Sequence, residues 1–176
     1  WGPDFPIVTV RDWVRSQVSF QSNTSNSMTS ALDTLHSHAG VCRDFAHLMI
    51  AMCRALNIPA RFTTAIDFGA DPALGPTDFH AYVEAYLDHR WYIFDPSGTA
   101  IPMGFVRIGT GRDAKDVAFA TIFGPAVMTS KQVSVEESDV GAPADATAAL
   151  PVQAPLQAPA PATGSTATAP VTVETA

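Results

Sequence analysis

The segment from Gly40 to Arg61 constrains the fold more than any other part of the sequence. It reads GVCRDFAHLMIAMCRALNIPAR, and nearly every residue from Phe45 to Leu56 is apolar or small. A helix that is apolar on all sides belongs in the centre of a domain rather than on its surface. Asn57 suits the left-handed position after a helix, and Pro59 cannot continue one. We therefore expect a central helix that carries Cys42 in its first turn.

The position of Cys42 gives its thiol a particular electrostatic setting. The positive end of the helix dipole and the unpaired N–H groups there favour the thiolate, which is the nucleophilic form. Cys53 follows eleven residues later on the same predicted helix, a rise of about 16 Å. This separation is too large for a disulfide. We expect two reduced thiols, which suits a cytoplasmic protein, and we interpret Cys53 as a small buried apolar residue.

Composition divides the chain into a globular part and a tail. Of the 176 residues 47% are hydrophobic, but Ala, Pro, Thr and Val dominate from about Gly141 onward, where aromatic residues are absent. Such a segment cannot bury enough apolar surface to offset the entropy lost on ordering. We expect one domain over residues 1–135, long enough for a single core, and a disordered Ala/Pro-rich tail over residues 136–176.

Charge and hydropathy narrow the class of partner. Up to Ser130 the sequence has 12 acidic and 9 scattered basic side chains, which argues against nucleic acid or an anionic membrane. No apolar run of about 20 residues could span a bilayer. The chain begins with Trp1 and lacks a charged-then-apolar leader. We expect a cytoplasmic protein whose natural N-terminus is missing from this fragment; a signal peptide lost with it stays an open alternative.

Helix signals come first along the chain and strand signals later. Apolar residues at helical spacing predict a helix over Val8–Val18 with Thr9 as its cap, and Ser30 with Asp33 resembles a capping box. A polar loop over residues 19–27 separates the two. Residue types and alternation predict strands over Arg61–Asp67, Phe79–Leu87, Trp91–Asp95 and Val106–Ile108, and further strands over Phe119–Phe123 and Met128–Val135, with loops at 68–78 and 109–115. Helices followed by an antiparallel meander indicate the α+β class.

A hairpin would bring two further residues into one constellation with Cys42. A two-residue turn at 88–89 places Asp95 opposite Tyr82, so that His80 is its diagonal neighbour on the same face, roughly 7–8 Å away between backbones. A slip of one residue would send the two side chains to opposite faces. A thiol, an imidazole that forms an ion pair with it and a carboxylate that orients the imidazole are the groups of a nucleophilic triad.

The segments around these residues resemble the three core motifs of the transglutaminase-like superfamily. They are GVCRDFAHL at Cys42, DFHAYVEAYL at His80 and WYIFDPSG at Asp95, and the resemblance to bacterial transglutaminase-like cysteine proteases runs from about Val8 to Ser130. It implies a papain-like α+β core in which the cysteine helix packs on an antiparallel sheet. It also implies that Cys42 is the nucleophile, His80 the general base and acid, and Asp95 the orienting residue. Members usually carry a further N-terminal β domain.

The residues and the resemblance together predict an enzyme that transfers acyl groups from amide or peptide bonds through a thioester. Water as acceptor gives a protease or amidase, and an amine gives a transglutaminase. Protein or peptide substrates with glutamine or other amide groups follow from this reading, and no cofactor is expected. The backbone N–H of Cys42 is one expected oxyanion donor; Trp13 and Gln17 are candidates for the second. The alternative is a catalytically degenerate domain that serves as a protein-interaction module.

Other chemistry-bearing residues have plainer interpretations. His47 lies five residues after Cys42, about 140° around the helix, so we do not expect it to be the base. His36 and His38 could converge with Cys42, but structural zinc needs four convergent ligands and Cys53 is too distant. We therefore expect no metal site. The glycines at 109–111 lack the spacing and the Lys-Ser/Thr of a phosphate loop and predict a turn.

Overall fold

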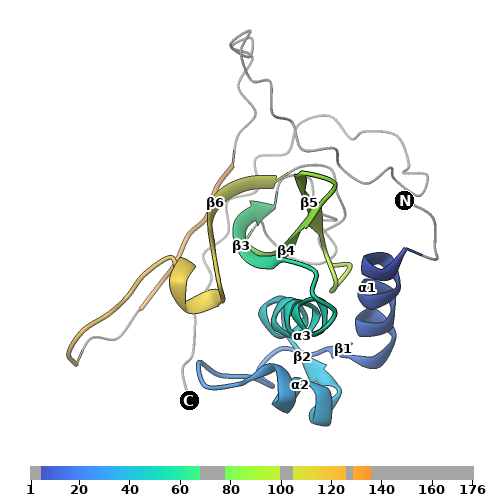
Figure 1. The fold of residues 1–176 in the computed structure, drawn as a ribbon. Coiled ribbons are helices and arrows are strands. Elements are labelled where there is room, and N and C mark those ends of the chain that lie inside the picture. The colour runs from blue at the N-terminus through green and yellow to red at the C-terminus, as the bar shows by residue number, and fades with distance from the viewer. Residues whose placement is uncertain (1–4, 68–77, 100–104, 126–128, 136–176) are drawn as a thin grey trace, which may run out of the picture.

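The fold combines helices from the first third of the chain with an antiparallel sheet formed by later residues (Figure 1). This computed structural model describes residues 5–67, 78–99, 105–125 and 129–135. In chain order the elements are α1 (Pro6–Gln17), β1 (Ser19–Phe20), α2 (Ala31–Ser37), β2 (Ala39–Gly40), α3 (Cys42–Ala55), β3 (Ala60–Asp67), β4 (Phe79–Leu87), β5 (Arg90–Phe94), β6 (Phe105–Gly111) and the short 3-10 helix η2 (Ala114–Val117). The expected α+β class is confirmed.

Local sequence signals identify the start of α2 correctly but not the start of α1. Helix α1 begins at Pro6 after Phe5, so the expected cap at Thr9 is wrong. Proline suits the first helical position because the N–H that it lacks would have no partner there. Helix α2 has the predicted capping box: the Asp33 N–H donates to Ser30 Oγ over 3.2 Å, and the Ser30 N–H donates to Asp33 Oδ2 over 2.9 Å.

Helix α3 lies at the centre of the described part of the molecule, between the sheet and α2, with α1 beside it (Figure 1). Buried residues such as Phe45 and Met49 pack with Phe62 of β3 and Val83 of β4. The helix ends as the sequence predicts, with Asn57 at a φ of 58°. It is not buried on all sides, because the side that includes Ala51 and Arg54 is exposed.

The sheet has the order β5-β4-β3-β6, and all its pairs are antiparallel. Strands β4 and β5 form the predicted hairpin, in which Leu87 pairs with Arg90. Its two turn residues, Asp88 and His89, have φ values of 45° and 63°. Two consecutive left-handed residues give a turn whose twist matches that of the paired strands. This turn sets the register that positions the site.

The structure differs from the sequence-based predictions at two segments that were expected to be loops. The expected loop at 109–115 is wrong: β6 continues to Gly111, which pairs with Phe62, and η2 follows. A Cβ on Gly111 would lie 2.5 Å from Asp116 Cβ, so glycine permits η2 to pack closely. The two-residue parallel pair of β1 and β2 falls in part on the expected loop at 19–27.

The strands expected near the end of the domain are absent among the described residues. Residues 119–123 are not a strand, and Phe119 stacks instead on Phe79 with ring centres 4.8 Å apart. Within 129–135, Lys131 forms only an isolated bridge. β-propensity alone does not create a strand without an edge to pair with. The predicted loop at 68–78 lies almost entirely, and the predicted tail at 136–176 entirely, outside the described residues.

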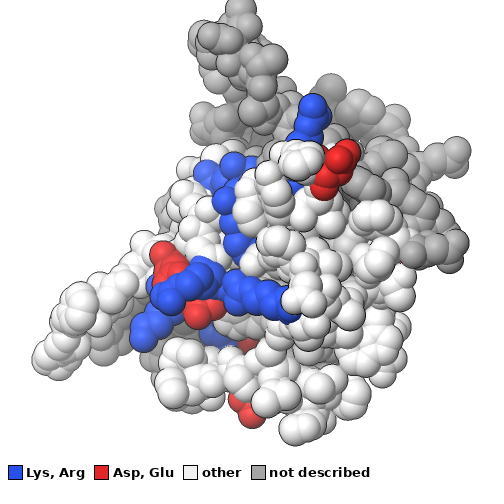
Figure 2. All heavy atoms as spheres, in the orientation of Figure 1, with Lys and Arg blue, Asp and Glu red and all other residues white. Residues whose placement is uncertain are grey.

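Basic and acidic side chains lie next to one another on the face of the molecule that Figure 2 shows. The exposed ion pair of Arg112 with Asp116, at 2.9 Å, is an example of such a contact among the described residues. The described residues contain no helix that is both long and apolar enough to span a membrane.

Candidate active site

Cys42 is the first residue of α3, where the sequence predicts it. The preceding residue, Val41, is extended with φ −104° and ψ 176°, so the chain turns sharply into the helix at this point. The Cys42 side chain is half-buried rather than enclosed. Its backbone N–H is among those at the helix start that have no partner within the helix. A half-buried thiol at this position can meet both a substrate and a neighbouring base.

The hairpin register brings His80 and Asp95 together as the alternation of residues predicts. His80 lies near the start of β4, and Asp95 directly follows β5. His80 Nε2 and Asp95 Oδ1 are 3.2 Å apart, and the two side chains are 7% and 13% exposed. A hydrogen bond in which both groups carry charge is stronger than a neutral one, and burial strengthens it further.

Asp95 is held in place by residues that the sequence analysis did not single out. The Ser97 N–H and Oγ donate to Asp95 Oδ1 over 3.0 and 2.7 Å, while Arg15 of α1 donates to the Asp95 carbonyl oxygen over 2.7 Å. An Asp followed two residues later by Ser is a common turn in which the carboxylate accepts from the backbone. That signal could have found Ser97, whereas nothing local marks Arg15.

The electrostatics of His80 follow from its two polar neighbours. Burial alone lowers the pKa of His80, but its interactions with Asp95 and with Cys42 outweigh burial and raise that pKa to about 10. For Asp95, burial acts to raise the pKa, but the hydrogen bond from His80 outweighs burial and keeps the pKa below its ordinary value. Near neutral pH the pair is therefore an imidazolium and a carboxylate, and the imidazolium interacts with the thiol group.

Tyr82 supports the imidazole from the side. Its ring meets the His80 ring edge-on, with ring centres 4.6 Å apart. Burial, together with the nearby acidic groups Asp67, Asp95 and Cys42, raises the pKa of the Tyr82 hydroxyl above its ordinary value. Tyr82 is therefore a neutral aromatic ring that packs against His80.

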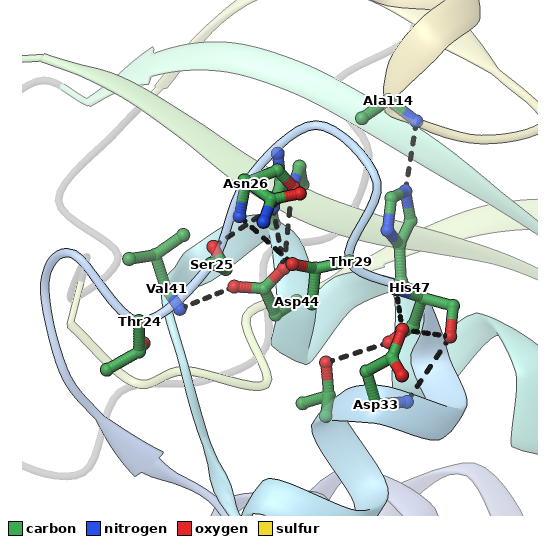
Figure 3. Close-up of polar contacts among 12 residues, drawn as sticks. Thr24, Ser25, Asn26, Thr29, Asp33, Val41, Asp44, His47 and Ala114 are labelled. Atoms are coloured by element: carbon green, nitrogen blue, oxygen red, sulfur yellow. Dashed lines mark hydrogen bonds and ion pairs between the residues drawn. The ribbon is translucent and has the colours of Figure 1, made fainter. Parts of the chain in front are cut away.

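The structure also describes the other residues that the sequence analysis considered. His47 Nε2 accepts the backbone N–H of Ala114 over 3.1 Å, as Figure 3 shows, and Cys53 is fully buried, which raises its pKa to about 12. The side-chain amide of Gln17 donates to Ser16 Oγ over 3.2 Å, and Trp13 on the same helix is 37% exposed. Within the described ranges, no group of three or more His, Cys, Asp or Glu residues could hold a metal ion.

Comparison with known proteins bears on the family and the fold. A model of the transglutaminase-like superfamily matches residues 5–96, which is more than half of the chain. The crystal structure of a "Putative Cysteine Protease" from Cytophaga hutchinsonii has a TM-score of 0.63 and 50% identity, covering 68% of this chain and 40% of that one.

Two mycobacterial proteins are also similar in sequence, and neither is characterized. One from Mycobacterium leprae is 33% identical over 121 residues, which cover 66% of this chain and 43% of the relative. One from Mycobacterium tuberculosis is 28% identical over 130 residues, which cover 65% and 41%. The chain thus spans less than half the length of these curated relatives.

Proposed function

Because this chain belongs to the transglutaminase-like superfamily, we propose that it transfers acyl groups from amide or peptide bonds through a thioester on Cys42. The observation that supports this most strongly is the placement of His80, which contacts Asp95 on one side and interacts with Cys42. A thiol, an imidazole and a carboxylate in this order are what nucleophilic catalysis by cysteine requires.

In the first step the Cys42 thiolate attacks the carbonyl carbon of the amide. A C–S bond forms, the C–N bond breaks, and the His80 imidazolium gives its proton to the departing amine. Because His80 Nε2 is bound to Asp95, the proton that passes to the amine is the one on the other ring nitrogen, Nδ1. The backbone N–H of Cys42 stabilises the negative charge that develops on the carbonyl oxygen. The products of this step are a free amine and a thioester on Cys42.

In the second step a nucleophile takes the acyl group from the thioester. His80, now neutral, accepts a proton from water or from a primary amine as it attacks the carbonyl carbon. The C–S bond breaks and the Cys42 thiolate is restored beside the imidazolium. Water as acceptor amounts to hydrolysis, and a lysine-like amine amounts to transamidation. A glutamine carboxamide or a peptide bond in a protein fits this chemistry as substrate.

Mass spectrometry of a peptide library incubated with the chain tests this function. The experiment is run with and without a primary amine, and Cys42→Ala serves as the control that removes only the nucleophile. Peptide cleavage or deamidation indicates hydrolysis, and a gain of the amine indicates transamidation. Both must disappear in the Cys42→Ala variant. If a folded wild-type chain produces no change in any peptide, the enzymatic proposal is wrong.

A further inference from the structure

The two residues that follow Cys42 form a charge pair inside the protein. The Asp44 side chain is completely buried, whereas that of Arg43 is 26% exposed. Asp44 Oδ1 accepts from Arg43 Nη2 over 3.0 Å and from Arg43 Nε over 3.3 Å. A buried carboxylate without such a partner would carry a large desolvation cost. Arg43 is therefore the charged partner of the buried Asp44 side chain.

The second oxygen of Asp44 fixes the start of helix α3. Oδ2 accepts the backbone N–H of Val41 over 2.8 Å (Figure 3), which is the acidic half of a capping box. A Cβ on Gly40 would lie 2.7 Å from Asp44 Cβ and 3.0 Å from Oδ2. Glycine is thus required at position 40 for the carboxylate to reach this place. The residue whose backbone it holds immediately precedes Cys42.

Arg43 also connects the start of α3 to the loop between β1 and α2. Its Nη2 donates to Ser25 Oγ over 3.0 Å and to the Asn26 carbonyl oxygen over 2.7 Å. Figure 3 shows this loop lying over Asp44 and the start of the helix. One guanidinium thus joins the loop between β1 and α2, the buried carboxylate and the helix that carries the thiol.

This arrangement has an electrostatic consequence for Cys42. A carboxylate at a helix N-terminus stabilises the helix, but a negative charge near a thiol opposes formation of a second negative charge. Among the described residues, His80 and Tyr82 of β4 interact with Cys42, and Asp95 is bound to His80. Without Arg43, Asp44 would counteract the imidazolium.

We propose that Arg43 balances the charge of Asp44, so that Asp44 can fix the start of α3 without suppressing the Cys42 thiolate. Both are positioning residues, since neither is placed to touch a substrate. This inference rests on the proposed role of Cys42 as nucleophile. A purely structural role would not predict the following difference. Removing the charge of Arg43 alone and removing the charge of Asp44 alone should shift the pH dependence of Cys42 alkylation in opposite directions.

The test is the pH dependence of Cys42 alkylation by iodoacetamide in three variants of the full chain. In Arg43→Gln the midpoint of the profile should rise, by about one pH unit for the loss of a partly buried positive charge next to Cys42 in sequence. In Asp44→Asn, whose amide oxygen can still accept from Val41, the midpoint should fall. The double variant should return close to the wild-type profile, because the two charges are removed together.

Arg54→Gln is the matched control, since it removes a positive charge from the other end of the same helix, where Arg54 binds the carbonyl oxygens of Ala60 and Arg112. Its profile should superimpose on that of the wild type. Circular dichroism checks that each variant is folded, and the expected fall of the midpoint in Asp44→Asn keeps the proposal testable if Arg43→Gln unfolds. Superimposed profiles, or shifts of Arg43→Gln and Asp44→Asn in the same direction, would overturn the proposal. Either result can be read even if the chain transfers no acyl group, so failure here is distinct from failure of the proposed function.

Discussion

Replacing Asp95 by Asn should lower the pKa of His80 by a measurable and calculable amount. Burial opposes the charged ring, and yet interactions with Asp95 and Cys42 raise the pKa of His80 from 6.5 to about 10. If Asp95 supplies about half of this rise, the asparagine variant should lower the pKa by roughly two units, or ~2.7 kcal/mol. The alkaline limit of proton transfer to the leaving amine should then move toward neutral pH by about two units, because His80 loses its proton at a lower pH.

The assay is an NMR titration of the histidine rings in the labelled full chain. His80 is assigned by comparison with His80→Gln, and Asp116→Asn, which removes a carboxylate from an exposed ion pair, serves as control. We expect the wild-type and control signals of His80 to titrate near pH 10, and the Asp95→Asn signal well below. A wild-type His80 that titrates near its ordinary 6.5, or an Asp95→Asn variant that matches the wild type, would refute the reasoning.

The same pair makes stability depend on pH in a direction that can be worked out. The pKa of His80 is higher in the folded than in the unfolded chain, so its contribution is complete below about pH 6.5 and is lost as pH rises toward 10. The pKa of Asp95 is lower in the folded chain, so its contribution is present above its unfolded pKa, about 3.9, and is lost in acid. Urea unfolding should therefore show the largest difference between wild type and Asp95→Asn from about pH 4 to pH 6.5, narrowing toward both extremes.

Three further predictions follow from burial, close packing and composition. Iodoacetamide should label Cys42 at least 100-fold faster than Cys53 near pH 7, since burial raises the pKa of Cys53 to about 12; peptide mapping of the labelled chain measures both rates, and equal rates would contradict the assignment. Gly40→Ala should cost roughly 1–3 kcal/mol in urea unfolding, because its Cβ would lie 2.7 Å from Asp44 Cβ; an unchanged midpoint would show that the helix start can shift freely. Removing residues 141–176 should leave the melting temperature within about two degrees, as we propose that this tail contributes nothing to the core, and a large drop in calorimetry would move the domain boundary.

The hairpin and the pair that depends on it could be predicted from the sequence because short-range rules govern them. Alternation from Phe79 to Leu87 together with a two-residue turn predicts one register, and that register puts His80 beside Asp95. The capping box of α2 is local in the same way, since Ser30 and Asp33 are three residues apart. In each case the partners are close in sequence or related by one turn.

What the sequence does not reveal depends on partners that are distant along the chain. The extension of β6 to Gly111 is stabilised by pairing with β3, some fifty residues earlier, and outweighs the turn tendency of its glycines. Arg15 reaches the Asp95 carbonyl oxygen across 80 residues. Arg43 binds Ser25, which lies 18 residues earlier in the chain. Local propensity carries no information about such contacts.

Direct detection of the acyl-enzyme tests the central claim most closely. The chain is incubated with peptide substrates, quenched in acid to preserve thioesters, digested and mapped by mass spectrometry, with His80→Gln treated in parallel. The account predicts an acyl adduct on the peptide that contains Cys42, abolished by hydroxylamine and strongly reduced in the His80→Gln variant. An adduct on Cys53, or an adduct on Cys42 that forms equally well without His80, would contradict it.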